Sequence, residues 1–228
     1  MTTAGRGRHA AVAYREAQHR YGAVFLIILT LLVFAVLAPD ADWARAVAVA
    51  LAGAALTVAV ATSRERGPVR SLRALVVGGA ALVVVIGIAT GALSAGVAFI
   101  VTTLVAASIP FALGGGLMRL IRDEGVTLQA VAGALAIYLL VGLLFASVIG
   151  FVAQVQSGPY FSQGGNVSNG DRVYYSFTVL TTTGFGDYTA AKPLGHALAV
   201  LEMLAGQLYL VTVIGILVGS FVARRSKS

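Results

Sequence analysis

Thr181-Thr182-Thr183-Gly184-Phe185-Gly186-Asp187 is a short polar stretch between two long apolar segments. Gly184 and Gly186 alternate with other residues, and glycine readily adopts φ > 0, which residues with a Cβ rarely do. A backbone that alternates in this way can turn successive carbonyl oxygens to the same side. Four copies around an axis would then form stacked rings of oxygens, which can replace the water shell of a small cation. The stretch therefore predicts a cation site built from the backbone.

This stretch resembles the selectivity filter of tetrameric potassium channels with one pore loop per subunit, in which TVGYG is the common form. Thr183 stands where the family usually has Val, and Phe185 where it usually has Tyr. The resemblance is strongest over residues 174–225, and a weaker likeness to the pore module of small bacterial channels extends back to Thr127. It implies that K⁺ binds at the carbonyls of Thr182, Thr183, Gly184 and Phe185, with Gly186 completing the filter and the Thr182 hydroxyl forming the innermost site.

The resemblance also implies roles for residues around the filter. Glu202 is an acid inside an apolar span, and it either bonds Ser or Thr hydroxyls behind the filter or tunes the field of the cavity. Its protonation state stays open, since no Lys or Arg lies at the same depth. The Thr183 hydroxyl is expected to bond the pore helix, and Phe185, which lacks a phenol, is expected to be held by packing or by a donor such as Tyr175. The residues expected to support the filter are Tyr174, Tyr175, Thr178, Asp187 and Glu202. Those expected to gate the pore are the hinge Gly206 and the cavity-facing Gln207, Leu210, Ile214 and Val218.

The composition is that of an integral membrane protein. The 228 residues are 58% hydrophobic and 11% charged, whereas soluble domains carry about 25% charged residues. Apolar runs of about 20 residues can each cross a bilayer as a helix. They begin near Tyr21, Trp43, Leu72, Gly96, Leu128 and Leu194. The predicted fold is therefore all-α, with six transmembrane helices and a re-entrant pore helix and filter loop between the fifth and the sixth, assembled as a homotetramer.

The charges predict the orientation of the chain. Of the 16 Lys and Arg residues, 13 lie before the first apolar run, between the second and third, after the fourth or after the last, and Asp40, Asp42, Asp171 and Asp187 fall on the other side. Basic loops stay in the cytoplasm, so both termini are expected to be cytoplasmic in the plasma membrane, with the filter at the outer side. The net charge of +7 thus reflects topology and predicts no nucleic-acid partner. Asp171 is expected to cap a pore helix over residues 172–181.

Four segments follow from this pattern: a cytoplasmic N-terminal segment at 1–20, a four-helix transmembrane domain at 21–125, a pore domain at 126–225 and a tail at 226–228. The expected partners are further copies of the chain and membrane lipid. A separate regulatory subunit and the gating stimulus stay open. The chain has no cysteine, phosphate loop or histidine cluster with metal spacing, so we expect no enzyme activity and no cofactor beyond the permeant ion.

Two other functions are compatible with parts of the sequence. A weakly selective monovalent cation channel would share the pore and differ in its preference between ions. A secondary transporter also uses a glycine-rich break in a helix, but such transporters carry a matching break in a second half of the chain. We find no second break, and a purely structural scaffold would not explain the hydroxyl-rich stretch.

The fourth apolar run predicts weak voltage dependence, because residues 96–118 contain no Lys or Arg. Moving one charge through 100 mV is worth about 2.3 kcal/mol, and steep gating takes roughly 3–4 such charges per subunit. Conductance–voltage curves in symmetric potassium should therefore be shallow. Steep activation that moves several elementary charges per assembly would show that a sensor lies elsewhere in the chain.

Overall fold

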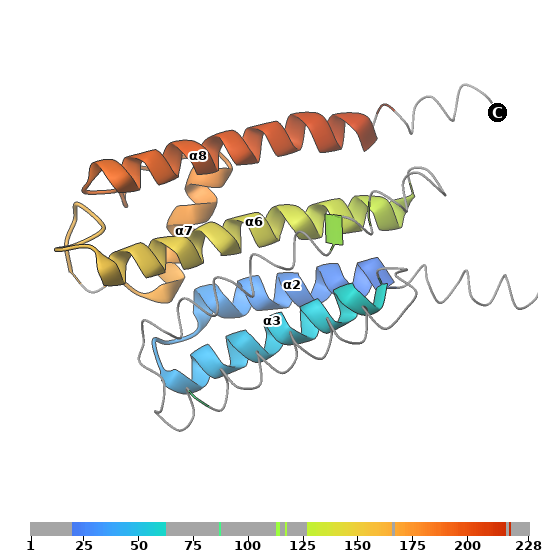
Figure 1. Ribbon diagram of the computed structural model, residues 1–228, viewed down its shortest axis with the longest axis horizontal. Coiled ribbons are helices and arrows are strands. Elements are labelled where there is room, and N and C mark those ends of the chain that lie inside the picture. Colours follow the sequence, from blue (N-terminus) through green and yellow to red (C-terminus); the bar gives the residue numbers. More distant parts are fainter. Residues whose placement is uncertain are drawn as a thin grey trace, which may run out of the picture.

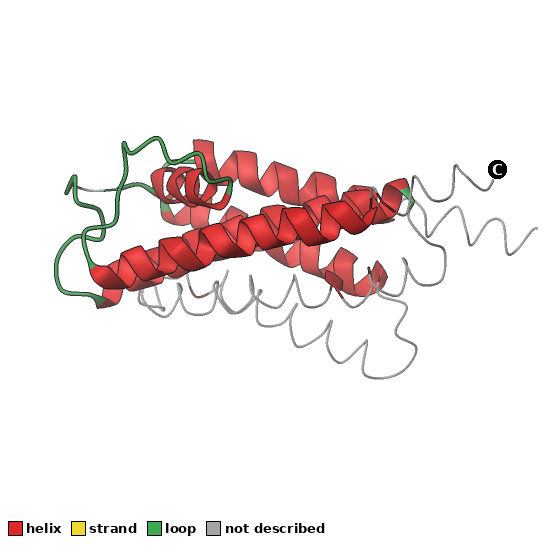
Figure 2. Ribbon diagram, turned by 90° about the horizontal axis from the view of Figure 1, so that it is seen from above, coloured by secondary structure: helices red, strands yellow, loops and turns green. Residues whose placement is uncertain are grey.

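The computed structural model describes residues 20–62, 127–165 and 167–217, together with Gly87, residues 113–114, Leu117 and Gly219. These residues form helices apart from loops and one isolated β-bridge. The elements are α2 (Arg20–Leu37), α3 (Asp42–Thr62), α6 (Leu128–Val155), α7 (Asn169–Leu180), α8 (Pro193–Tyr209) and the π-helix η1 (Leu210–Ile214) (Figures 1 and 2). The third and fourth predicted spans lie almost entirely outside the described residues, so the count of six stays a prediction.

Two of the described helices are long and apolar enough to cross a membrane. They are Leu128–Val155, with 28 residues, and the continuous stretch Pro193–Leu217, with 25. At 1.5 Å per residue α6 is about 42 Å long, more than the hydrocarbon core of about 30 Å. Thr127 begins α6 as its N-cap, because its side chain accepts a hydrogen bond from Ala130 N at 3.3 Å. The prediction of a helical membrane protein is confirmed to this extent.

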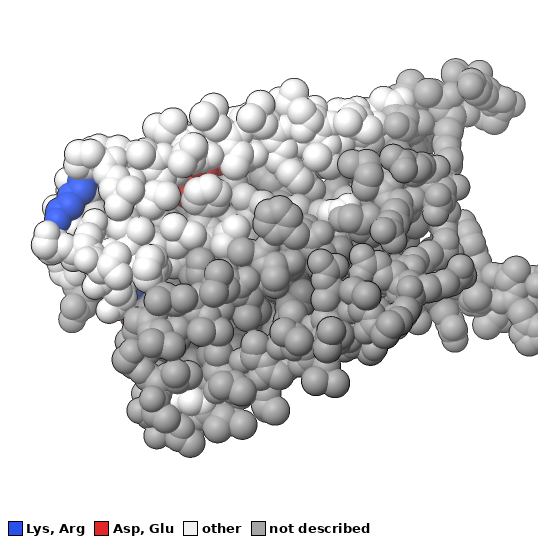
Figure 3. Space-filling view, in the orientation of Figure 1, with Lys and Arg blue, Asp and Glu red and all other residues white. Residues whose placement is uncertain are grey.

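The helices pack side by side, with α6 between the α2–α3 hairpin and α8 (Figure 1). One apolar core joins the hairpin to α6, and the side chains of Val24, Ile28 and Leu140 are almost completely buried in it. The short helix α7 contacts α6, α8 and α2. The described surface on the face in Figure 3 is almost free of charged side chains, and its basic atoms lie at the end where the loops gather. This arrangement suits a lipid environment.

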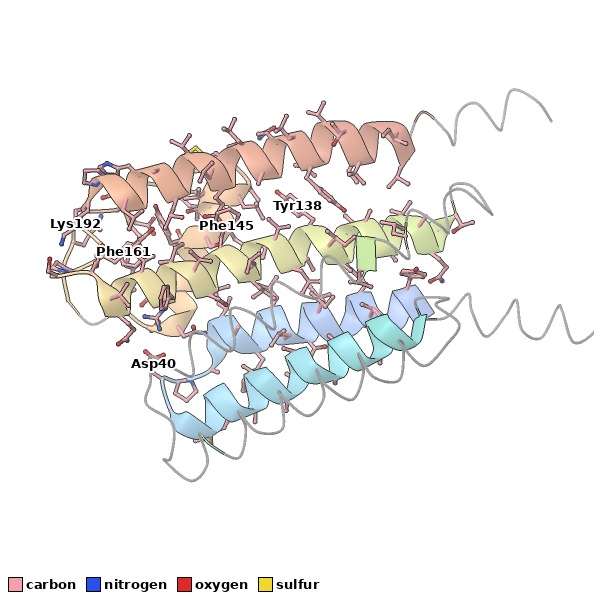
Figure 4. The ribbon with its side chains drawn as sticks, viewed as in Figure 1. Asp40, Tyr138, Phe145, Phe161 and Lys192 are labelled. Atoms are coloured by element: carbon pink, nitrogen blue, oxygen red, sulfur yellow. The ribbon has the colours of Figure 1, made fainter. Side chains whose placement is uncertain are left out.

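Helix α2 is hydrogen-bonded to α6 near its start, and the turn after it is hydrogen-bonded to α7. Gly22 N donates to Gln129 Oε1 of α6 at 3.0 Å, and Asn169 N of α7 donates to Asp40 Oδ1 at 2.9 Å. The turn that holds Asp40 therefore lies at the same end as the start of α7, as the charge pattern predicts for Asp40 and Asp171. Figure 4 shows Phe161 and Lys192 at this end as well.

Helix α8 touches the end of α7 directly through backbone atoms. A Cβ placed on Gly206 would lie 2.2 Å from the Leu180 carbonyl oxygen, which is far closer than any real contact. Gly206 is buried, and small residues of this kind let membrane helices approach closely. Close packing by itself therefore requires glycine at this position, and the hinge function expected from the resemblance stays a prediction.

Replacing Gly206 with Ala should destabilise the protein, because α8 must move away from Leu180 to admit the methyl group. Overpacking of this kind costs about 1–3 kcal/mol. Thermal unfolding in detergent would measure the loss. Gly215→Ala is the matched control in the same span, since a Cβ there meets nothing within 4 Å. Equal melting temperatures for the two variants would contradict the close contact.

Candidate functional site

Helix α7 begins with a capping box rather than with an aspartate cap. Ser168 is the N-cap, its Oγ accepts from Asp171 N at 3.0 Å, and Asp171 Oδ2 accepts from Ser168 N at 3.0 Å. The helix therefore starts at Asn169, and the prediction that Asp171 caps a helix starting at residue 172 was wrong. The spacing Ser-x-x-Asp carried the correct signal, because a hydroxyl at the N-cap and an acid three residues later satisfy each other's backbone.

The C-terminal end of α7 is satisfied by the first residues of the filter. A helix leaves its last four carbonyls without partners, and water cannot supply them inside a membrane. The Thr178 carbonyl accepts from both Thr183 N, at 2.8 Å, and Gly184 N, at 3.1 Å. The other bonds are Thr181 N to Phe177 O at 3.1 Å, Thr182 N to Val179 O at 2.9 Å and Tyr138 Oη to Leu180 O at 3.4 Å. Tyr138 belongs to α6, and its side chain lies between α6 and α8 (Figure 4).

Every second residue of the filter has a positive φ. The values are 57° at Thr182, 51° at Gly184 and 81° at Gly186, which confirms the alternation expected from the glycines. Thr182 was not foreseen, because a β-branched residue in this region is strained by about 1–3 kcal/mol. Two bonds hold it: its N–H donates to Val179 O, and its hydroxyl accepts from Gln207 Nε2 of α8 at 3.0 Å.

The other threonines link the filter to the helix behind it. Thr181 Oγ1 donates to Phe177 O at 2.7 Å, so the 2.8 Å contact between the Thr181 and Thr183 hydroxyls needs Thr183 as donor. The expected bond from the Thr183 hydroxyl to the pore helix thus reaches its C-cap, Thr181. Thr178 Oγ1 donates instead to Tyr175 O, within its own helix.

The two neighbouring tyrosines of α7 have different partners. The Tyr174 ring is parallel to that of Phe185, with 6.4 Å between centroids, and the Tyr174 hydroxyl hydrogen-bonds Asp187. Tyr175 is buried and packs edge-on against Phe161, with 5.0 Å between ring centroids. Phe185 is therefore held by packing against the Tyr174 ring, which is one of the two alternatives that the sequence left open.

The segment after the filter contacts the loop before α7. The sequence did not predict these contacts. Phe161 and Ala190 form an antiparallel bridge, and Ala191 N donates to Tyr160 O at 2.8 Å. The Tyr188 hydroxyl hydrogen-bonds Asp171 at the start of α7. No local pattern predicts these contacts, because the partners are up to about 30 residues apart in sequence. Together they join the segment after Asp187, the loop before α7 and the start of α7 into one unit.

Glu202 lies behind α7 and is completely buried. Its Oε1 is 2.5 Å from Ser176 Oγ, and Ser176 Oγ is 2.7 Å from the Gly142 carbonyl of α6. Of the two roles expected for Glu202, this geometry favours the bond to a hydroxyl behind the filter. Ser176 is one of the hydroxyls that the sequence places on the helix behind the filter.

A π-helix follows α8 in the region expected to gate the pore. Gln207 is exposed and reaches the filter, but the π-helix η1 follows, and its wider turn shifts the faces of the residues beyond it. Leu210 is half-buried, Ile214 is half-buried against the core, and Val211 is 70% exposed. The cavity-facing roles of Leu210 and Ile214 stay predictions. Val218 lies outside the described residues, and its role stays a prediction.

One comparison with known proteins gave a match. Residues 134–223 match a family model described as "Ion channel". The matched region runs from α6 through α7 to beyond α8 and includes the whole filter. The comparison with curated proteins found no match.

Asp171 should make the stability of the pore unit depend on pH in the acid range. Burial raises the pKa of Asp171, but the hydrogen bonds from Ser168 and Tyr188 outweigh it, so the pKa lies below its ordinary value of 3.8. A lowered pKa stabilises the fold above the ordinary value, and this contribution disappears as pH falls through the lowered pKa. Asp171→Asn should therefore unfold at a lower temperature at neutral pH and lose less stability on acidification.

Thermal unfolding from about pH 6 to about pH 3 would measure this dependence. Tyr188→Phe removes only one of the bonds to Asp171 and should give an intermediate profile. An Asp171→Asn profile parallel to that of the unmodified protein would contradict the assignment.

Proposed function

Because residues 134–223 form an ion channel domain, we propose that four copies of this chain conduct potassium passively across the plasma membrane. The observation that carries the proposal is the filter backbone, whose φ angles alternate in sign from Thr182 to Gly186. Carbonyl rings built from such a backbone can replace the hydration shell of K⁺. Thr182, Thr183, Gly184 and Phe185 are the proposed ligands.

The exposure of the filter supports assembly around an axis. Residues 181–187 are all exposed in the single chain, although polar backbone at membrane depth is tolerated only where protein covers it or water reaches it. Closed rotational symmetry meets both conditions, since neighbouring copies cover one side and the pore wets the other. The exposed apolar residues of α8 would pack against those copies or lipid. They include Val200, Leu201, Leu204 and Leu208.

The electrostatics of α7 favour a cation. Its C-terminal end, the negative pole of the helix dipole, leads directly into Thr181 and Thr182. The Thr183 hydroxyl is engaged by Thr181, and we infer that this leaves the Thr183 carbonyl for the ion. Phe185 is held by Tyr174 despite the absence of a phenol of its own. These contacts favour a rigid filter and hence selectivity for K⁺ over Na⁺.

A weakly selective cation channel is the second candidate, since Thr183 and Phe185 both depart from the common filter. The ion channel match favours either of these channels over a secondary transporter. The proposed orientation places the outer mouth and the Asp40 turn outside the cell and both termini in the cytoplasm. Glu202, Tyr174 and Asp187 are proposed to support the filter, and Gln207 to line the cavity below it.

Replacing Gly184 with Ala should abolish potassium flux while the protein still assembles. Alanine at a positive φ costs about 1–2 kcal/mol, and relief of this strain would turn the carbonyls away from the axis. Flux into liposomes would be measured, with size-exclusion chromatography to follow assembly. Gly164→Ala is a matched control, because Gly164 has a φ of +69° and open space around it but lies in the outer loop.

Reversal potentials of the purified protein under a potassium/sodium gradient would separate the two channel functions. A potential close to the potassium equilibrium value supports selectivity, whereas a potential near zero supports the weakly selective channel. Undiminished flux in Gly184→Ala would exclude this segment as the filter.

A further inference from the structure

Glu202 stands out because its carboxyl group is buried without a countercharge. The side chain has no exposed surface, and Oε2 has no hydrogen-bond partner. Burying an ionised carboxylate is costly unless it is paired and fully hydrogen-bonded. The observed contacts satisfy only one of its two oxygens.

The hydrogens available around Ser176 decide which form of Glu202 fits. The Ser176 hydroxyl has one proton, yet it lies 2.7 Å from the Gly142 carbonyl and 2.5 Å from Glu202 Oε1. If Glu202 were ionised, both neighbours would be acceptors, and one of these contacts would bring two oxygens together with no hydrogen between them. If Glu202 is protonated, it donates to Ser176 Oγ and Ser176 donates to Gly142 O. Only the neutral acid makes both contacts hydrogen bonds.

The groups facing Glu202 cannot neutralise it. The titratable neighbours that interact with it are Tyr138 of α6, Tyr175 of α7 and Tyr160 of the loop before α7. All three are phenols that carry no positive charge in either form. Among the described residues, the Ser176 hydroxyl is the hydrogen-bond partner of the carboxyl group.

We propose that Glu202 is a positioning residue that holds the filter in place as a neutral acid, and that its ionisation at alkaline pH closes the conducting path. The bond chain Glu202–Ser176–Gly142 joins α8, α7 and α6 directly behind the filter. Loss of the proton leaves the Ser176 hydroxyl between two acceptors with a single proton to share, and repulsion in the contact that lacks a hydrogen separates the three helices. The link matters for conduction because Ser176 lies on the helix whose C-terminal carbonyls hold Thr183 and Gly184. This inference rests on the proposed potassium flux.

The pH profile of potassium flux into liposomes tests the proposal. Flux through the unmodified protein should fall reversibly at alkaline pH, by about tenfold or more per pH unit once Glu202 titrates. Glu202→Gln keeps a donor for Ser176 and cannot ionise, so its profile should be flat over the same range. Tyr160→Phe removes a different buried titratable group with an unpartnered hydroxyl and should retain the alkaline loss. An unchanged profile in Glu202→Gln, or no alkaline loss in the unmodified protein, would overturn the proposal.

Infrared spectroscopy gives a second readout that does not depend on conduction. At neutral pH the unmodified protein should show the carbonyl band of a buried protonated carboxylic acid, and Glu202→Gln should lack it. The absence of this band would overturn the inference even if potassium flux is present. A band without any flux at any pH would instead contradict the proposed function and leave the neutral acid established.

Discussion

The structure depends on how the last carbonyls of α7 are satisfied inside the membrane. This helix has 12 residues and ends far short of a full span, so its final carbonyls have neither helix nor water as partners. The backbone N–H groups of residues 181–184 supply most of the missing donors, and Tyr138 supplies one from α6. The same bonds that complete the helix therefore set the starting geometry of the filter. The hydrogen bonds that support the end of α7 are the same ones that shape the filter.

A short helix at this depth also has to be held by its neighbours. Three close approaches achieve this, and in each a glycine removes the atoms that would prevent contact. A Cβ would clash between Gly142 and Phe177, between Gly170 and the Val36 carbonyl, and between Gly206 and the Leu180 carbonyl. Helices α6, α2 and α8 thus reach α7 from different directions. The α2–α3 hairpin is consequently part of the support of α7 and contacts it at its N-terminal end.

Polar contacts then add specificity to this packing. Tyr174 reaches Phe185 and Asp187 at the mouth, Gln207 reaches Thr182 at the inner end, and Ser176 with Glu202 lies behind. The contacts of Gln207 and Glu202 join segments that are distant along the chain, whereas Tyr174 contacts the filter that follows its own helix. These contacts connect the filter and α7 to α6 and α8, and the proposed role of Glu202 depends on this connection.

The sequence by itself determined the features that depend on local chemistry. The lengths of the apolar runs predicted α6 and α8, the Ser-x-x-Asp spacing held the true start of α7, and Gly184 and Gly186 predicted the alternating backbone. These follow because hydrophobic length, capping and the absence of a Cβ act within a few residues. The tertiary structure alone decided which partners meet across helices: that Tyr174 stacks on Phe185, that Thr182 shares the positive φ, and that Glu202 bonds Ser176. It also placed the π-helix η1 directly after α8. Such outcomes depend on the packing of distant segments, and no short stretch of sequence contains that information.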